Sequence, residues 1–209
     1  MNKKDYHIQY FKSISKGLDT SSYYINNSKK ETAVFFKEID NVLLTLFEKK
    51  GKIFFFGNGA SAAFANHMAL DFSKNGKILS RSLSDSALLT ALSNDYSFEE
   101  AMTEYLKMEG VTTNDLVVTI SSSGSSSNII GVLEYCTNNH IKSLSLSGLK
   151  IDNRSIQLSD YAIFVQMKTY GIVECLHQIF LHLILDSYMN VFEWEKVEVQ
   201  NMNSEHFSL

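Results

Sequence analysis

The sequence predicts an α/β protein, a three-layer αβα sandwich on a five-stranded parallel sheet with a helical N-terminal extension. From Gly51 onward, short β-rich runs alternate with helix-like stretches, which is typical of parallel βαβ units. The chain has 209 residues, of which 44% are hydrophobic. This is enough for one domain with a substantial core, and it excludes wholesale disorder.

The expected elements follow from hydrophobic periodicity. Apolar residues recur at helical spacing in 6–18 and 28–50, with the polar stretch SSYYINNS between them as a break. Strands are expected at 52–56, 77–83, 115–120, 141–147 and 161–165, and further helices at about 61–74, 126–138 and 171–190. We therefore expect residues 1–50 to form the extension, 51–192 the α/β domain and 193–209 a polar tail.

Composition excludes several classes of partner. The net charge of −4 and the pI of about 5.9 disfavour a broad basic surface, so no nucleic acid is expected. No apolar run reaches the roughly 18 residues of a membrane span, and no apolar core follows the basic residues at the start. Cys136 and Cys175 lack CxxC spacing and fall in apolar stretches, so we expect two buried thiols in a reducing cytoplasm.

The first strand is followed by a glycine-containing loop, Gly57-Asn58-Gly59-Ala60-Ser61. Glycine permits a close backbone approach to a ligand, and Ser61 can cap the next helix or bind an anion there. With Ala62 the loop also approaches the dinucleotide fingerprint, for which Asp85 would be the acidic partner. Both interpretations remain open from this loop alone.

The third strand is followed by six serines around one glycine, residues 121–127. Their flanks, DLVVTI and NIIGVLEYC, both form core, which argues against a linker. Hydroxyls, backbone N–H groups and a helix N-terminus can hold a phosphate without arginine, and the chain has only Arg81 and Arg154. Plain helix capping is the alternative. Ligands bind at the carboxyl ends of parallel strands, so two such loops favour a small phosphorylated ligand over a dinucleotide.

Histidines and carboxylates recur at helical spacing in two places. His67 and Asp71 lie four residues apart on one helix face. They could form a local hydrogen-bonded or charge pair, or they could bind a metal or act in acid–base catalysis. On the last helix, Glu174 and His182 project about 80° apart and are expected to converge. His177 projects about 140° from His182 and is expected to be a hydrogen-bonded core or interface histidine. The set His67, Asp71, Glu174 and His182 suits Zn²⁺ or another divalent metal.

Four motifs in the same order carry a family resemblance. They are GNGASAAFANHMALD, LSND at 92–95, ISSSGSSSNII and VECLHQIFLHLI. Together they resemble the SIS (sugar isomerase) domain family and, within it, the phosphoheptose isomerases. The resemblance spans about residues 25–188, and the leading helix fits the family's helical N-terminal extension.

The resemblance implies a cytoplasmic isomerase that interconverts sedoheptulose 7-phosphate and D-glycero-D-manno-heptose 7-phosphate. It implies a homotetramer with active sites between subunits, to which the extension contributes, and no membrane partner. The phosphate would be held by the serine loop, at Ser121, Ser122, Ser123 and Ser126. The sugar would be surrounded by Asn58, Gly59, Ala60, Ser61, Asn94, Asp95 and Glu174. One Zn²⁺ or another divalent metal per site would be held by His67, Asp71, Glu174 and His182, with Asp71 and His182 as the acid–base pair.

This chain departs from the family pattern at three places. Asp71 stands for a glutamate, Glu174 for a glutamine, and Ile172 for an arginine, with Gly171 replacing an acidic or polar residue beside it. With two carboxylates in place of one, the site would bind a dication more strongly than the family's usual site. Two other functions stay open: a non-catalytic SIS domain that senses sugar phosphates or assists assembly, and an isomerase for a different phosphosugar.

Overall fold

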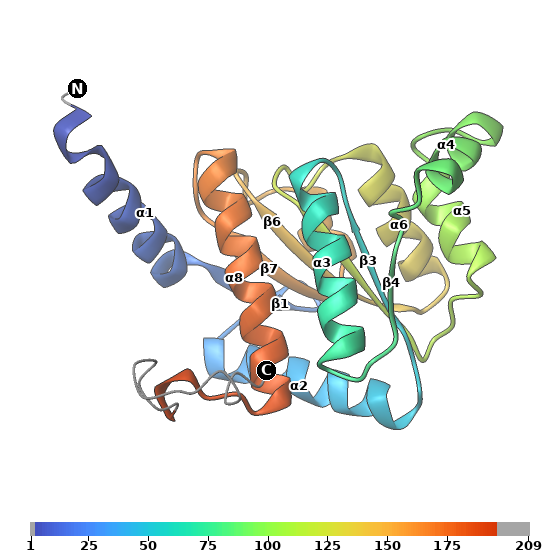
Figure 1. Cartoon of the computed structure of the whole chain (residues 1–209), viewed down its shortest axis with the longest axis horizontal. Helices are drawn as coiled ribbons and strands as arrows, with labels where there is room; N and C mark the ends of the chain where they lie inside the picture. Colours follow the sequence, from blue (N-terminus) through green and yellow to red (C-terminus); the bar gives the residue numbers. More distant parts are fainter. Residues whose placement is uncertain (1–2, 196–209) are drawn as a thin grey trace, which may run out of the picture.

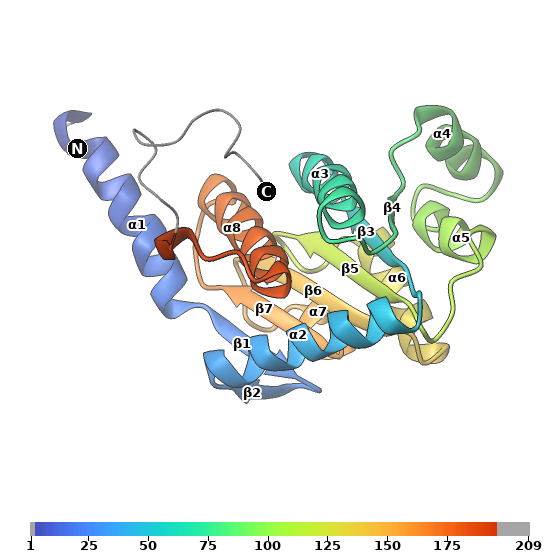
Figure 2. The ribbon, with the colours of Figure 1, turned by 60° about the horizontal axis from the view of Figure 1, so that its bottom comes forward.

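A seven-stranded sheet forms the centre of the computed structural model, which describes residues 3–195. Its order is β2-β1-β7-β6-β5-β3-β4; Figure 1 shows the sheet among its helices, and Figure 2 labels all seven strands. The five parallel strands are β3 (Ile53–Gly57), β4 (Ser80–Ser82), β5 (Leu116–Ser121), β6 (Lys142–Gly148) and β7 (Tyr161–Val165). The predicted α/β class and its parallel strands are therefore confirmed, although β4 is shorter than the 77–83 expected.

The two further strands correct the expectation of a polar break before Gly51 and of a helix that starts at residue 28. Strands β1 (Ser22–Ile25) and β2 (Ser28–Lys30) form a hairpin, and β1 pairs antiparallel with β7. The turn consists of Asn26 and Asn27, whose φ angles of 48° and 61° suit the tight turns of hairpins. Tyr23 is buried and its ring packs near Phe35. The strand-forming aromatic and β-branched residues of SYYI and the Asn-Asn turn are the signals that were missed.

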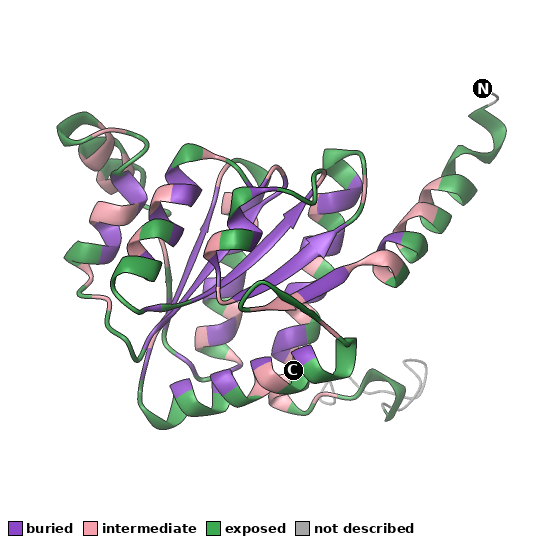
Figure 3. Cartoon of the chain, turned by 180° about the vertical axis from the view of Figure 1, so that it is seen from behind, coloured by how far each residue is buried: buried purple, intermediate pink, exposed green. Residues whose placement is uncertain are grey.

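Helices cover both faces of the sheet, which makes three layers (Figure 2). One face carries α2 (Thr32–Glu48), α3 (Ala60–Lys74) and α8 (Tyr170–Met189). The other carries α5 (Ala101–Met108), α6 (Ser127–Asn138) and α7 (Arg154–Leu158). Neighbouring strand residues alternate between the faces: Phe55 packs with Phe72 of α3, and Phe54 and Phe56 pack with Tyr105 of α5. Buried residues accordingly run along the strands (Figure 3).

Several short or peripheral helices complete the described residues. The first long helix, α1 (Tyr6–Thr20), extends away from the sheet and approaches α8 where Gly17 meets Leu176. The helices α4 (Ser86–Asp95), α5 and α7 were not predicted. Two short 3₁₀ helices are η1 (Lys3–Asp5) and η2 (Glu193–Glu195). Because the described residues end at 195, most of the expected polar tail, 193–209, lies outside them. Within residues 3–195, no helix is both long enough and apolar enough to cross a bilayer.

Candidate functional site

The two donor-rich loops lie side by side at a reversal in the strand order. From β3 the chain crosses through α3 to β4 on one side, whereas from β5 it crosses through α6 to β6 on the other. The register pairs Gly57 with Ile120, which aligns the carboxyl ends of the two strands. Such a switch point is where open α/β sheets bind ligands. The topology therefore places both loops at one candidate site.

A polar cavity of about 120 Å³ lies at this point. It is lined by residues from three segments: Asn58, Ser61, Ile120, Ser121, Ser122, Ser123, Ser126, Tyr170 and Glu174. Seven of these are residues that the sequence singled out, from the glycine loop, the serine loop and α8. Tyr170, the first residue of α8, was not singled out, because an isolated tyrosine at a helix start carries no motif.

The serine loop is held so that its donors remain available. The carbonyl oxygen of Ser122 accepts a hydrogen bond from the Gly148 N–H at 3.0 Å. The carbonyl oxygen of Gly124 accepts from the N–H and the Oγ of Ser155, at 3.0 and 2.9 Å. Within residues 3–195, the N–H groups of Ser123 and Ser126 make no hydrogen bond, and the buried Ser122 Oγ also has no partner. Unpaired buried polar groups are rare, so the buried Ser122 Oγ, beside the half-buried Ser123 and Ser126, favours a site for an acceptor-rich group.

The charges around this cavity are unusual for an anion site. Both arginines are engaged elsewhere, Arg81 facing Glu109 at 3.9 Å and Arg154 paired with Glu134. No lysine or arginine side chain of the described residues lines the cavity, and the one ionisable carboxylate is Glu174. The N-terminus of α6 opens at the serine loop, so backbone dipoles and hydroxyls supply the positive potential.

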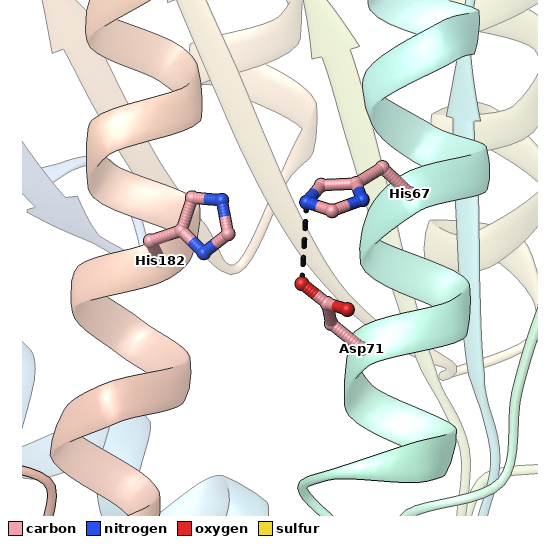
Figure 4. Close-up of side chains that lie close together, drawn as sticks. All are labelled: His67, Asp71 and His182. Atoms are coloured by element: carbon pink, nitrogen blue, oxygen red, sulfur yellow. Dashed lines mark ion pairs between the residues drawn. The ribbon is translucent and has the colours of Figure 1, made fainter. Parts of the chain in front are cut away.

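A second group of side chains lies between α3 and α8 (Figure 4). His67 and Asp71 of α3 and His182 of α8 bring one ligand atom each to within 4.8 Å of one another. His67 Nε2 lies 3.2 Å from Asp71 Oδ2, and the rings of His67 and His182 are 5.4 Å apart. The Nε2 of Gln178 lies 2.8 Å from His182 Nε2. Two imidazoles and a carboxylate match a zinc site with three protein ligands and one open position.

Glu174 lies apart from this three-residue group and lines the serine-loop cavity instead. It precedes His182 by eight residues, a rise of about 12 Å along the helix. The expectation that both side chains converge considered only their angle around the helix axis. The axial distance separates them within one chain.

Other residues named from the sequence occupy different places. Gly59 has a φ of 57° and Ala60 begins α3, so both shape the loop next to the cavity without lining it. Asn94 and Asp95 lie exposed at the end of α4, where Asn94 Nδ2 donates to Asp95 Oδ1 at 3.0 Å. Within this chain they do not line the cavity.

The expectations for the thiols and for His177 hold only in part. Cys136 is buried, and burial raises the pKa of its thiol to about 12, but Cys175 is exposed, which corrects the expectation of two buried thiols. His177 is fully buried as expected, yet neither ring nitrogen makes a regular hydrogen bond within residues 3–195. Burial lowers the pKa of His177 to about 4, with the nearby Ser147 backbone opposing this shift.

Comparisons with known proteins agree with this architecture. The SIS domain family model matches residues 19–148. A phosphoheptose isomerase of Helicobacter pylori (strain ATCC 700392 / 26695) is 32% identical over 156 residues, covering 72% of this chain and 80% of that protein. A probable phosphoheptose isomerase of Thermoplasma volcanium is 30% identical over 185 residues, covering 83% and 93%. The solved phosphoheptose isomerase GmhA of Neisseria gonorrhoeae shares the fold, with a TM-score of 0.73, 21% identity and coverage of 88% and 95%.

Proposed function

The chain belongs to the SIS domain family, and from this premise we propose that it is a phosphosugar isomerase acting on sedoheptulose 7-phosphate. The product would be D-glycero-D-manno-heptose 7-phosphate. The observation that carries the proposal is the cavity whose serine-loop donors lack partners within the described residues. A phosphate monoester supplies the acceptor oxygens that these donors require. The relatives named as phosphoheptose isomerases support the choice of sugar.

The reaction moves a proton between C1 and C2 of the open-chain sugar through an enediol. Serine hydroxyls and backbone N–H groups hold the remote phosphate and position the reacting carbons. Asp71 takes the proton from carbon, and His182 exchanges protons with the two oxygens. Asp71 is mostly buried, with its side chain 16% exposed, so solvent competes weakly for its carboxylate.

A divalent metal fits the donor set of His67, Asp71 and His182. When bound, it would polarise the carbonyl and hydroxyl oxygens of the sugar. These three side chains would hold the ion from one chain, and the resemblance implies Glu174 as a fourth ligand. We propose Zn²⁺ or another divalent ion, one per active site.

We further propose a homotetramer with active sites between subunits. In one chain, Glu174 lies with the serine-loop cavity and not with the three-residue group, whereas the resemblance implies that all four residues share a site. A neighbouring copy would bring its Glu174 to the group on α3 and α8. The exposed outer part of α1, with Tyr6 63% and Phe11 67% exposed, would be covered in the same assembly. Both cysteines are free, which suits the cytoplasm.

The direct test is turnover of sedoheptulose 7-phosphate beside other ketose phosphates. We expect the heptulose phosphate to be the preferred substrate. D71N and H182Q should each lower kcat by at least about 1000-fold, since each removes a proton-transfer group. Circular dichroism and sedimentation should match those of the wild type. Full turnover by both variants would contradict the assignment.

Sites shared between subunits predict complementation. E174A and H182Q should each be nearly inactive alone, and mixed tetramers from co-expression should regain a substantial fraction of turnover, because some sites combine both intact residues. A mixture that stays inactive, although mass spectrometry shows mixed tetramers, would place each site within one chain.

A non-catalytic SIS domain is the main alternative. The paired histidines and carboxylate between α3 and α8 favour catalysis, because polar groups held between packed helices contribute little to a scaffold. Binding of sugar phosphates without turnover would favour the alternative. Titration with NAD(H) tests the dinucleotide interpretation, and we expect no binding because the second loop occupies the switch point.

A further inference from the structure

Two asparagines from separate segments form a closed pair beside the cavity. Asn58 Nδ2 donates to Asn128 Oδ1 at 2.9 Å, and Asn128 Nδ2 donates to Asn58 Oδ1 at 2.9 Å. Asn58 belongs to the glycine loop and lines the cavity, whereas Asn128 is the second residue of α6. Asn128 is 2% exposed and does not line the cavity. The pair therefore links the glycine loop to the start of α6, and its Asn128 side lies away from the cavity.

The direction of each amide in this pair is determined by the backbone. Asn128 Oδ1 also lies 3.0 Å from the backbone N–H of Ile129, which can only donate. An amide flip at Asn128 would set its NH₂ group against this donor. The orientation of Asn128 in turn dictates that of Asn58, because each amide must offer a donor where the other offers an acceptor. Asn58 consequently presents its remaining N–H and lone pair at fixed positions.

We infer that Asn128 is a positioning residue of the substrate site, which sets the orientation of the Asn58 amide at the cavity. This inference rests on the proposed function, in which Asn58 contacts the phosphosugar. Asn128 acts through Asn58 and does not touch the ligand. Without it, Asn58 rotates freely and offers its donor or its acceptor at random.

An Asn58 amide of fixed direction lowers the cost of binding. A free amide must be ordered when the ligand arrives, and in its flipped orientation it places oxygen against an oxygen-rich sugar phosphate. Preorganised groups avoid both costs, and side chains around binding sites are commonly fixed by hydrogen bonds of this kind. A simple structural role, stabilising the start of α6, is the competing explanation.

A double-mutant cycle separates the two explanations. We would measure kcat/KM for sedoheptulose 7-phosphate, and its Kd by calorimetry, in the wild type, N128A, N58A and the double variant. N128A should lower kcat/KM about tenfold, chiefly through KM, and should cause no further loss in the N58A background. An equal loss in both backgrounds, or no loss in either, would overturn the inference.

Two more variants separate the loss of the hydrogen bond to Asn58 from a general destabilisation of α6. N128D keeps the shape and the acceptor for Ile129 but cannot donate to Asn58, so it should lose at least as much activity as N128A. T137V in the same helix removes the hydrogen bonds from Thr137 Oγ1 to the carbonyls of Leu133 and Leu158. It should lower the melting temperature and leave kcat/KM unchanged. An N128D variant with wild-type kcat/KM would contradict the inference.

A failure of the inference about Asn128 can be distinguished from a failure of the proposed isomerase function. If the wild type binds the sugar phosphate but does not isomerise it, the proposed function fails, and the same cycle on Kd still tests Asn128. If the wild type turns over and the cycle shows no coupling, only the role of Asn128 fails.

Discussion

The serine-loop cavity and the His67–Asp71–His182 group are two polar regions that differ in construction. The cavity is built at strand ends, from backbone N–H groups and short hydroxyl side chains whose loop carbonyls are tied into the protein. The group between α3 and α8 is built from side chains alone, and His67 remains 48% exposed. The first region is complete within one chain, whereas the second has the composition of a site that a cation and a neighbouring copy would finish.

This difference indicates a division of labour. A cradle made of backbone barely moves when its ligand arrives, so it suits the binding of a constant group such as phosphate. Side chains on two helices can be altered one at a time by substitution, such as the aspartate at position 71, and they suit the chemical step. The following predictions test this division, in order of decreasing free-energy effect.

Metal removal should act on the histidine group and spare the cavity. After chelation, turnover should fall about 1000-fold, or about 4 kcal/mol, since a Lewis acid supplies several kcal/mol to such steps. Zinc should restore turnover and raise the melting temperature, and it should not raise that of H67A. Equal turnover with and without metal would show that these three residues act without an ion.

His177 lies on α8 between the two regions, and it should control stability and not turnover. Its pKa is about 4 in the folded protein, below the ordinary value of 6.5. The unfolded chain thus binds the extra proton, and stability is lost as pH falls from 6.5 towards 4, by about 3 kcal/mol in total. Urea unfolding across this range should show this loss in the wild type and not in H177L. Parallel pH profiles would contradict the prediction.

The serine loop should bind phosphate through the serines that face the cavity. The double variant S123A/S126A should raise KM about 100-fold with a smaller change in kcat, because each lost hydrogen bond to a charged group costs about 1.5 kcal/mol. S125A is the matched control, since Ser125 belongs to the same loop but does not line the cavity. A similar rise in KM for S125A would indicate general disruption of the loop.

Tyr170 should make the smallest contribution, at the rim of the cavity, where it is 59% exposed. Y170A should raise KM about tenfold, whereas Y170F should stay within about threefold if the ring matters more than the hydroxyl. Tyr96 is similarly exposed, at 56%, and does not line the cavity, so Y96A should leave KM unchanged. An unaltered KM in Y170A would remove Tyr170 from the site.

Much of the fold was predictable because its signals are local. The buried runs at 53–57, 116–121 and 161–165 are short, apolar and bounded by turn residues, and each forms a strand. The hairpin around Asn26 and Asn27 was missed because β1 is stabilised by pairing with β7, which lies more than a hundred residues later. The helices α4 and α5 were missed because their apolar stripes are short and rest on one another.

The sequence by itself determined which functional groups the chain offers and in which order they occur. Residue types and spacing were sufficient for the two donor-rich loops, the pairing of His67 with Asp71 and the family, because these depend on neighbours within a few residues. Only the tertiary structure decided which groups meet. It joined Asn58 to Asn128, added Tyr170 to the cavity and separated Glu174 from His182, because distances between elements depend on strand register and on the rise of a helix, and residue spacing alone does not contain them.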